Sequence, residues 1–123
     1  MWNLQIEPSI DVVLVGLDHH FNYYMICYAV KCLEAGAKLV VCATDRHDRL
    51  HGKLIPALGP LVESITTASG VSDYAIIGKP DPMMLKLAQT RDNLDLSKAV
   101  LFGDKMETDI KCAMSGGTSS GLV

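Results

Sequence analysis

Two aspartates at the end of an apolar segment are the residues of this sequence best placed to do chemistry. Asp104 and Asp109 lie five residues apart, after the apolar residues 100–102 and Gly103. This pattern is typical of a buried parallel strand, and open α/β folds bind ligands at the carboxyl ends of such strands. Mg²⁺ usually takes one or two carboxylates and shares phosphate oxygens of the substrate. The pattern therefore predicts a Mg²⁺ site at Asp104 and Asp109.

The residues around the aspartates are expected to shape this strand end. Gly103 can allow a sharp turn, because glycine reaches conformations closed to other residues. Thr108 can cap a helix that begins near Asp109, whose negative charge is favourable at a helix N-terminus. Both carboxylates would then point toward one binding site at the carboxyl edge of the sheet.

A family resemblance follows from two short motifs in this order. G-D-x-x-x-T-D at residues 103–109, preceded by G-K-P at residues 78–80, resembles motifs four and three of the haloacid dehalogenase-like (HAD) phosphatases. The resemblance implies that Lys79 and Asp104 are catalytic, with Lys79 neutralising charge on the phosphoryl oxygens. It also implies that Asp104 binds Mg²⁺ directly and that Asp109 supports the metal from the outer shell. Lys105 stands where the family commonly has arginine, so the planar fork needed for bidentate pairing is lost.

The nucleophile of the family has no counterpart in the sequence. These enzymes form an aspartyl-phosphate on the first aspartate of a D-x-D-G motif, and the sequence contains no D-x-D. Asp18 follows an apolar segment, but His20 replaces the second aspartate. We therefore expect the chain to correspond to roughly the C-terminal half of such an enzyme and to be inactive alone. The alternative is a truncated, non-catalytic HAD-like module that binds phosphate or a partner.

The N-terminal part resembles the large α/β cap of the phosphoglycolate, pyridoxal phosphate (chronophin) and 4-nitrophenyl phosphatase group. The similarity starts near Asp11 and predicts a boundary between residues 1–74, the C-terminal part of the cap, and residues 75–123, the C-terminal part of the core. It implies a small phosphorylated metabolite as substrate, with 2-phosphoglycolate first and pyridoxal 5′-phosphate second. The charged loop would select the substrate, through its residues Asp45, Arg46, His47 and Arg49.

Periodicity predicts an α/β fold in which strands alternate with helices. Such an order favours a parallel, Rossmann-like sheet, here HAD-like, and by itself fits many functions. The expected strands are residues 11–17, 38–43, 74–77, 99–102 and 120–123. The expected helices are residues 22–35, 58–69, 82–91 and 109–114, and residues 44–53 are expected to form a polar loop. Asp81 can cap the third helix, whose inner face would carry Met84, Leu87 and Ala88.

The amino-acid composition restricts the binding partners and the cellular compartment that we expect for the chain. A formal net charge of −3 gives no electrostatic footprint for nucleic acid, and no apolar run has the length of a membrane span. The four cysteines form no C-x-x-C pair and are expected to be small core residues of a reducing compartment. We therefore expect a cytoplasmic protein, with a homodimer through the cap as a further expectation. A third function, receiver-like signalling with Mg²⁺ on Asp104, would need a lysine at a later strand end, where the sequence has none.

Overall fold

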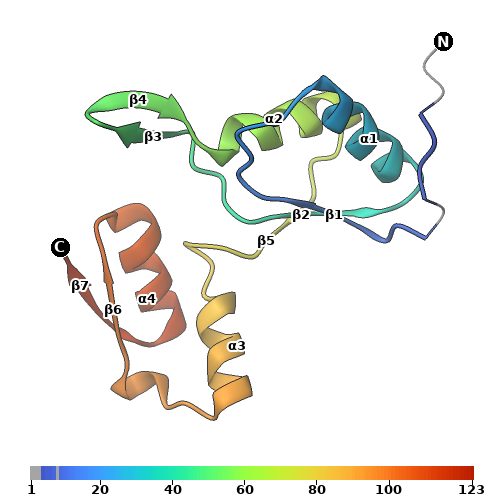
Figure 1. Cartoon of the computed structure of the whole chain (residues 1–123). Helices are drawn as coiled ribbons and strands as arrows, with labels where there is room; N and C mark the ends of the chain where they lie inside the picture. The colour runs from blue at the N-terminus through green and yellow to red at the C-terminus, as the bar shows by residue number, and fades with distance from the viewer. Residues whose placement is uncertain (1–3, 8) are drawn as a thin grey trace. The chain divides into compact units, whose positions relative to one another are not determined.

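The computed structural model describes residues 4–7 and 9–123 of the chain. It divides into two compact units, Met1–Ala75 (unit 1) and Ile76–Val123 (unit 2). Both units combine helices with parallel strands, so the predicted α/β class is confirmed (Figure 1). The assignment of unit 1 to a cap and of unit 2 to a core remains a prediction.

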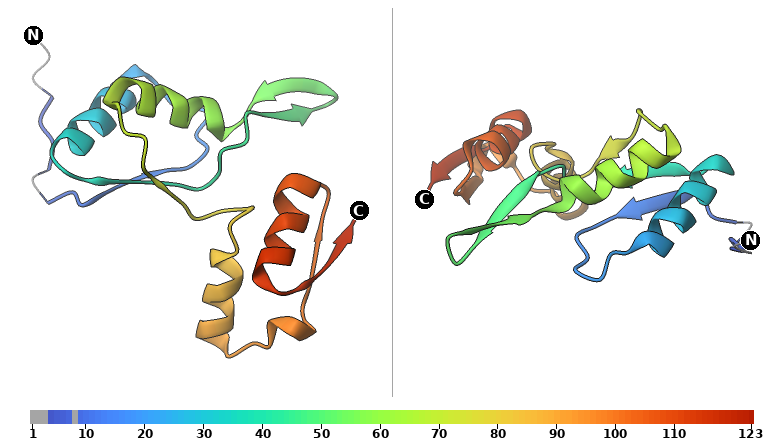
Figure 2. Two further views of the ribbon diagram at one scale, coloured as in Figure 1. Left: turned by 180° about the vertical axis from the view of Figure 1, so that it is seen from behind. Right: turned by 90° about the horizontal axis from the view of Figure 1, so that it is seen from above.

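Unit 1 is a small α/β layer structure. Its sheet has the order β1-β2-β5, and β1 pairs with β2 in parallel from Val12↔Lys38 to Val15↔Val41. Both helices of the unit lie on the same side of β1 and β2 (Figures 1 and 2). The elements are β1 (Val12–Val15), α1 (Tyr23–Glu34), β2 (Lys38–Val41), β3 (His47–Leu50), β4 (Lys53–Pro56), α2 (Leu58–Ser69) and β5 (Ala75–Ile76), which crosses the boundary between the two units.

The core of unit 1 lies between this sheet and the two helices. Buried apolar side chains come from both layers, and a fully buried Val, Leu or Ile contributes roughly 1.5–3 kcal/mol by leaving water. The buried apolar residues are Val15, Ala29, Cys32, Leu33, Leu39, Val41, Ala57, Leu58, Val62 and Ile65. Helix α1 contributes Ala29, Cys32 and Leu33 to this core, and α2 has the predicted bounds, with Gly70 as its left-handed C-cap at φ 74°.

The predicted polar loop at residues 44–53 is wrong, because most of it folds as an antiparallel hairpin. Strands β3 and β4 pair from His47↔Pro56 to Leu50↔Lys53 and extend away from the rest of unit 1 (Figure 1). The turn residues His51 and Gly52 have φ values of 50° and 77°. Positive φ at both central residues is what a type I′ hairpin turn requires, and its twist matches that of the strands.

Unit 2 contains two parallel strands with helical segments beside them. Strand β6 pairs with β7 from Val100↔Ser119 to Gly103↔Leu122. The elements are α3 (Met83–Asp92), the 3₁₀ turn η1 (Leu96–Lys98), β6 (Val100–Gly103), the π-helical segment η2 (Met106–Ile110), α4 (Lys111–Gly116) and β7 (Ser119–Leu122). The buried apolar side chains of this unit are Leu96, Ile110, Cys112 and Ala113.

The predicted inner face of helix α3 is not the face that packs against the rest of unit 2. Met84 and Leu87 are exposed, and none of its residues is buried. The half-buried Leu85 instead lies against α4, where its Cδ1 atom comes within 2.5 Å of a Cβ built on Gly116. The N-cap of α3 is Pro82 and not the predicted Asp81, although Asp81 Oδ1 accepts a hydrogen bond from the Met83 N–H at 2.8 Å.

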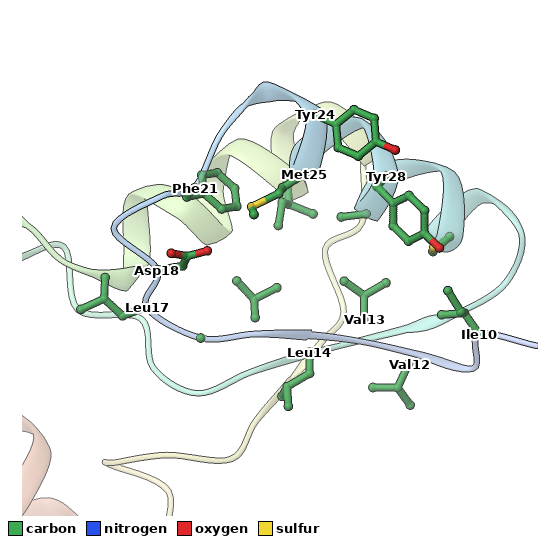
Figure 3. Close-up of a pocket in the computed structure, with 15 residues that line it drawn as sticks. Ile10, Val12, Val13, Leu14, Leu17, Asp18, Phe21, Tyr24, Met25 and Tyr28 are labelled. Atoms are coloured by element: carbon green, nitrogen blue, oxygen red, sulfur yellow. The ribbon is translucent and has the colours of Figure 1, made fainter. Parts of the chain in front are cut away.

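An apolar groove of about 720 Å³ lies between β1 and α1 in unit 1. Val13 points from the strand toward the helix, where Tyr24, Met25 and Tyr28 face it, whereas Leu14 points to the opposite side (Figure 3). All lining residues belong to unit 1, while Lys79, Asp104 and Asp109 belong to unit 2. The groove is therefore not the predicted phosphate site. Within the described part of the chain, no helix has the length and apolar character to cross a membrane.

Candidate active site

The predicted lysine and one predicted carboxylate form a direct ion pair in unit 2. The Nζ atom of Lys79 donates to Oδ1 of Asp109 at 2.5 Å. The Lys79 side chain is 46 % exposed, whereas that of Asp109 is only 4 % exposed. The pair thus joins a half-exposed lysine side chain to a buried carboxylate.

The second oxygen of Asp109 fixes the start of the following helical segment. The Lys105 N–H donates to Asp109 Oδ2 at 3.1 Å, and the Asp109 N–H donates to the Lys105 carbonyl at 2.9 Å. This reciprocal pair resembles a capping box, in which an acidic side chain reaches back to the N-cap N–H. The prediction that Thr108 caps a helix beginning near Asp109 is therefore wrong, because the helical segment already begins at Met106 with Lys105 as N-cap.

The surroundings of Asp109 keep it ionised. The hydrogen bond from Lys79 lowers the pKa of this carboxyl below its usual range, against the opposing effect of burial. The backbone N–H of Lys105 lowers the pKa further. A buried carboxylate is stable only when it is paired and hydrogen-bonded in this way. Asp109 therefore supplies a fixed negative charge that holds the ammonium of Lys79.

Asp104 lies in a different environment from Asp109. It is exposed and follows directly after Gly103, the last residue of β6. Across the described residues, no group of three or more His, Cys, Asp or Glu side chains could hold a metal ion. An exposed carboxylate at a strand end still fits Mg²⁺, which keeps several waters and needs one or two protein carboxylates. Asp104 is the better placed of the two, since both oxygens of Asp109 already accept hydrogen bonds.

A buried thiol supports the segment that carries Lys79. Cys112 Sγ donates to the Asp81 carbonyl at 3.4 Å and so links α4 to the residues just after Lys79. Burial raises the pKa of the Cys112 thiol, which keeps its proton available for this bond. All four cysteines are free thiols, and Cys32 is buried as well. The support from Cys112 was not part of the sequence prediction.

The predicted substrate-selecting residues all lie in or next to the hairpin of unit 1. Asp45 and Arg46 precede β3, while His47 and Arg49 are exposed on it. The Arg49 Nη1 donates to the Gly52 carbonyl at 3.3 Å, which ties this side chain to the hairpin turn. Arg46 also lines a pocket of about 440 Å³ at the base of the hairpin, with Glu63 and Tyr74.

Asp18 lies in unit 1 and serves a local turn. Its Oδ1 accepts a hydrogen bond from the His20 N–H at 2.8 Å. The sequence interpretation had set Asp18 aside as a nucleophile, and its turn-forming bond gives the carboxylate a structural role. The roles of Lys79, Asp104 and Asp109 in chemistry remain predictions that rest on the arrangement described above.

Comparisons with known proteins agree on one family. Residues 76–123 match the family model described as HAD-hydrolase-like. The glycerol-3-phosphate phosphatase of Gallus gallus is 33% identical over 85% of this chain and 34% of its own length. Chronophin of Homo sapiens is 34% identical over 88% of this chain and 38% of its own length.

A solved structure supports the same relationship. The glycerol phosphate phosphatase of Mycobacterium tuberculosis, determined in complex with magnesium, matches with a TM-score of 0.81 and 29% identity. The match covers 91% of this chain and 33% of that one. Together with the motifs and the α/β fold, these matches indicate a HAD-like phosphatase, to part of which this chain is similar. It spans 34% to 38% of the length of the two curated relatives named above.

Proposed function

We propose that the chain supplies the lysine, the metal carboxylate and part of the cap of a Mg²⁺-dependent phosphatase for small phosphorylated metabolites. The observation that carries this proposal is the Lys79–Asp109 pair at the strand end beside Asp104. The ammonium of a half-exposed lysine side chain, which a buried carboxylate holds in place, is a suitable anchor for a phosphoryl group. The solved relative in complex with magnesium supports the choice of metal.

Each side chain has a separate task in this proposal. Lys79 donates to a phosphoryl oxygen and reduces its negative charge, while Asp109 keeps Lys79 charged and in place. Asp104 would hold Mg²⁺, which, when bound, supplies charge neutralisation at the phosphoryl oxygens. The Lys79 ammonium donates one of its three N–H bonds to Asp109, and this bond fixes the position of its charge.

The attacking carboxylate must come from residues that this sequence does not contain. The family resemblance assigns this role to the first aspartate of D-x-D-G, and no D-x-D occurs in the chain. Turnover is therefore proposed for the complete protein, and the 123-residue chain is expected to bind phosphate without hydrolysing esters.

The substrate class is a small phosphorylated metabolite. Two names given to relatives, glycerol-3-phosphate phosphatase and dihydroxyacetone phosphatase, describe three-carbon substrates of this kind. We propose 2-phosphoglycolate first and pyridoxal 5′-phosphate second, with the β3–β4 hairpin as the selecting element. In a complete enzyme, Arg49→Ala should then raise KM for an anionic metabolite more than for 4-nitrophenyl phosphate. An equal rise in KM for both substrates would show that the hairpin does not select the substrate.

The test of the phosphate site measures binding of inorganic phosphate to the chain in the presence of Mg²⁺. Lys79→Ala should weaken binding roughly tenfold or more, since a charge-assisted hydrogen bond is lost. Lys98→Ala is the matched control, because Lys98 is a lysine of the same unit that pairs with Asp95 at 3.5 Å. Equal affinity in wild type and Lys79→Ala would overturn the proposal.

A second assay separates the enzyme from the non-catalytic module. The chain and the complete protein are incubated with Mg²⁺ and 4-nitrophenyl phosphate, and acyl-phosphate is trapped. Turnover by the complete protein alone supports the proposal, whereas phosphate binding without turnover in both favours the module. Turnover by the chain that is lost in Asp18→Asn would identify Asp18 as the attacking carboxylate.

A further inference from the structure

Gly103 occupies the point where strand β6 meets the candidate active site. It is the last residue of the strand and precedes Asp104 directly. Its φ lies outside the left-handed region, unlike those of Gly36, Gly52, Gly70 and Gly117. The sharp turn expected at this strand end therefore does not need a positive φ at Gly103. The absence of a side chain must matter here for another reason.

The space above the Gly103 Cα atom is filled by the side chain of Asp109. A Cβ atom built on Gly103 would lie 2.3 Å from both Cβ and Cγ of Asp109 and 2.5 Å from its Oδ2. Separations of this size lie far inside the 3.5–4.0 Å at which carbon atoms attract each other. Any side chain at position 103 would thus compete with Asp109 for the same volume.

Neither residue can move aside easily. The Val123 N–H donates to the Gly103 carbonyl at 3.0 Å, which continues the pairing of β6 with β7. The Asp109 N–H donates to the Lys105 carbonyl at 2.9 Å, and both carboxylate oxygens accept hydrogen bonds. The conflict includes the Cβ of Asp109, which is fixed to the backbone, so a side-chain rotation alone would not relieve it.

Two other glycines of unit 2 show why this contact is different. A Cβ on Gly116 would meet the Cδ1 atom of Leu85 at 2.5 Å, and one on Gly121 would meet the ring of Phe102 at 2.6 Å. Both are outer atoms of side chains that can rotate, and Phe102 is exposed. At Gly103 the neighbour is a buried carboxylate that carries the ion pair with Lys79.

We propose that Gly103 is a positioning residue, whose missing side chain makes the space in which Asp109 holds Lys79. It acts through Asp109 and touches no substrate. The link to phosphate rests on the proposed function, whereas the steric requirement rests on the geometry alone.

The first test is a direct measurement of the ion pair by NMR on the full chain. Wild type should show a scalar coupling across the hydrogen bond between the Lys79 Nζ nitrogen and the Asp109 carboxylate carbon. Gly103→Ala should lose this coupling, while Gly116→Ala, which creates a comparably close contact beside Leu85, should keep it. A folded Gly103→Ala protein that retains the coupling would overturn the proposal.

The second test is a double-mutant cycle for stability, which also covers a Gly103→Ala protein that fails to fold. Asp109→Gly removes all three atoms that conflict with a side chain at position 103. The cost of a glycine within the helical segment is present in both Asp109→Gly proteins and cancels in the cycle. Gly103→Ala should therefore be far less destabilising in the Asp109→Gly background. Equal destabilisation in both backgrounds, or failure of the double variant to fold where Asp109→Gly folds, would contradict the proposal.

Binding of inorganic phosphate with Mg²⁺ distinguishes this inference from the function on which it rests. Gly103→Ala should weaken phosphate binding by about as much as Lys79→Ala, roughly tenfold or more. Loss of the NMR coupling in a chain whose wild type binds no phosphate would uphold the positioning role of Gly103 and reject the proposed phosphate site. Phosphate binding that Lys79→Ala weakens and Gly103→Ala leaves unchanged would uphold the site and overturn the role of Gly103.

Discussion

The ammonium of Lys79 lies 2.5 Å from the carboxylate of Asp109, although 30 residues separate them in the chain. The contact connects the segment before α3 with the segment after β6 inside one unit. Because only the lysine faces solvent, the two partners contribute unequally to stability and to binding.

Removal of the lysine should destabilise the chain more than removal of the carboxylate charge. Lys79→Met leaves a buried carboxylate without its cation and should cost about 2–3 kcal/mol, less than a fully buried pair because Lys79 is half exposed. Asp109→Asn leaves a lysine that water can solvate and should cost about 1 kcal/mol. Urea unfolding at neutral pH measures both values. Equal costs would show that burial of Asp109 does not control the pair.

The Lys79–Asp109 pair should also make the unfolding free energy depend on pH in the acid range. The folded-state pKa of Asp109 is lowered, chiefly by the hydrogen bond from Lys79, whereas the unfolded value is about 3.9. The stabilisation is therefore fully present above about pH 4 and is lost as the pH falls through the folded-state pKa. The difference in unfolding free energy between wild type and Asp109→Asn should shrink as the pH falls below about 4. A difference that is constant over this range would contradict the prediction.

Substitutions at Asp104 and Asp109 should affect different properties: Mg²⁺ affinity at Asp104 and stability at Asp109. Asp104 is exposed, so Asp104→Asn should weaken Mg²⁺ binding with little change in the urea midpoint. Asp109→Asn should lower the midpoint and retain more of the Mg²⁺ affinity, because its oxygens serve Lys79 and the Lys105 N–H. Isothermal titration with Mg²⁺ checks the first effect. Unchanged affinity in Asp104→Asn would remove it from the metal site.

Much of this arrangement could be predicted from the sequence, since periodicity and end signals act locally. The bounds of α2 follow from its apolar stripe and from Gly70, and the strand end at Gly103 follows from the apolar run before it. The direct contact between Lys79 and Asp109 was not predicted, because it depends on how β6 and η2 pack. The steric role of Gly103 was missed for the same reason, since a glycine at a strand end equally predicts a turn.

The hairpin was missed because its strands carry no buried stripe. All four residues of β3 are exposed, so their polarity indicated a loop. The available signal was Gly52 between two short segments, with His51 before it in place of the more usual asparagine or aspartate. A two-residue turn between strands with solvent on both faces leaves little trace in hydrophobic periodicity.

The hairpin turn should respond to substitutions that change the cost of positive φ. Gly52→Ala should destabilise the hairpin by about 1–2 kcal/mol, because a side chain disfavours φ near 77°. His51→Asn should be neutral or slightly stabilising, since asparagine tolerates this conformation well. Hydrogen exchange of the β3 and β4 amides reports the local opening. Faster exchange in His51→Asn than in wild type would contradict the turn assignment.

Gly59 ties the base of the hairpin to helix α2. Its N–H donates to the Asp45 carbonyl at 2.7 Å, and a Cβ at this position would lie 2.7 Å from the same oxygen. The Ala57 N–H donates to the Arg46 carbonyl at 3.3 Å, so both ends of the connection are held. Two backbone hydrogen bonds therefore join helix α2 to the base of the hairpin, and we expect a tilt of α2 to displace the exposed turn at His51.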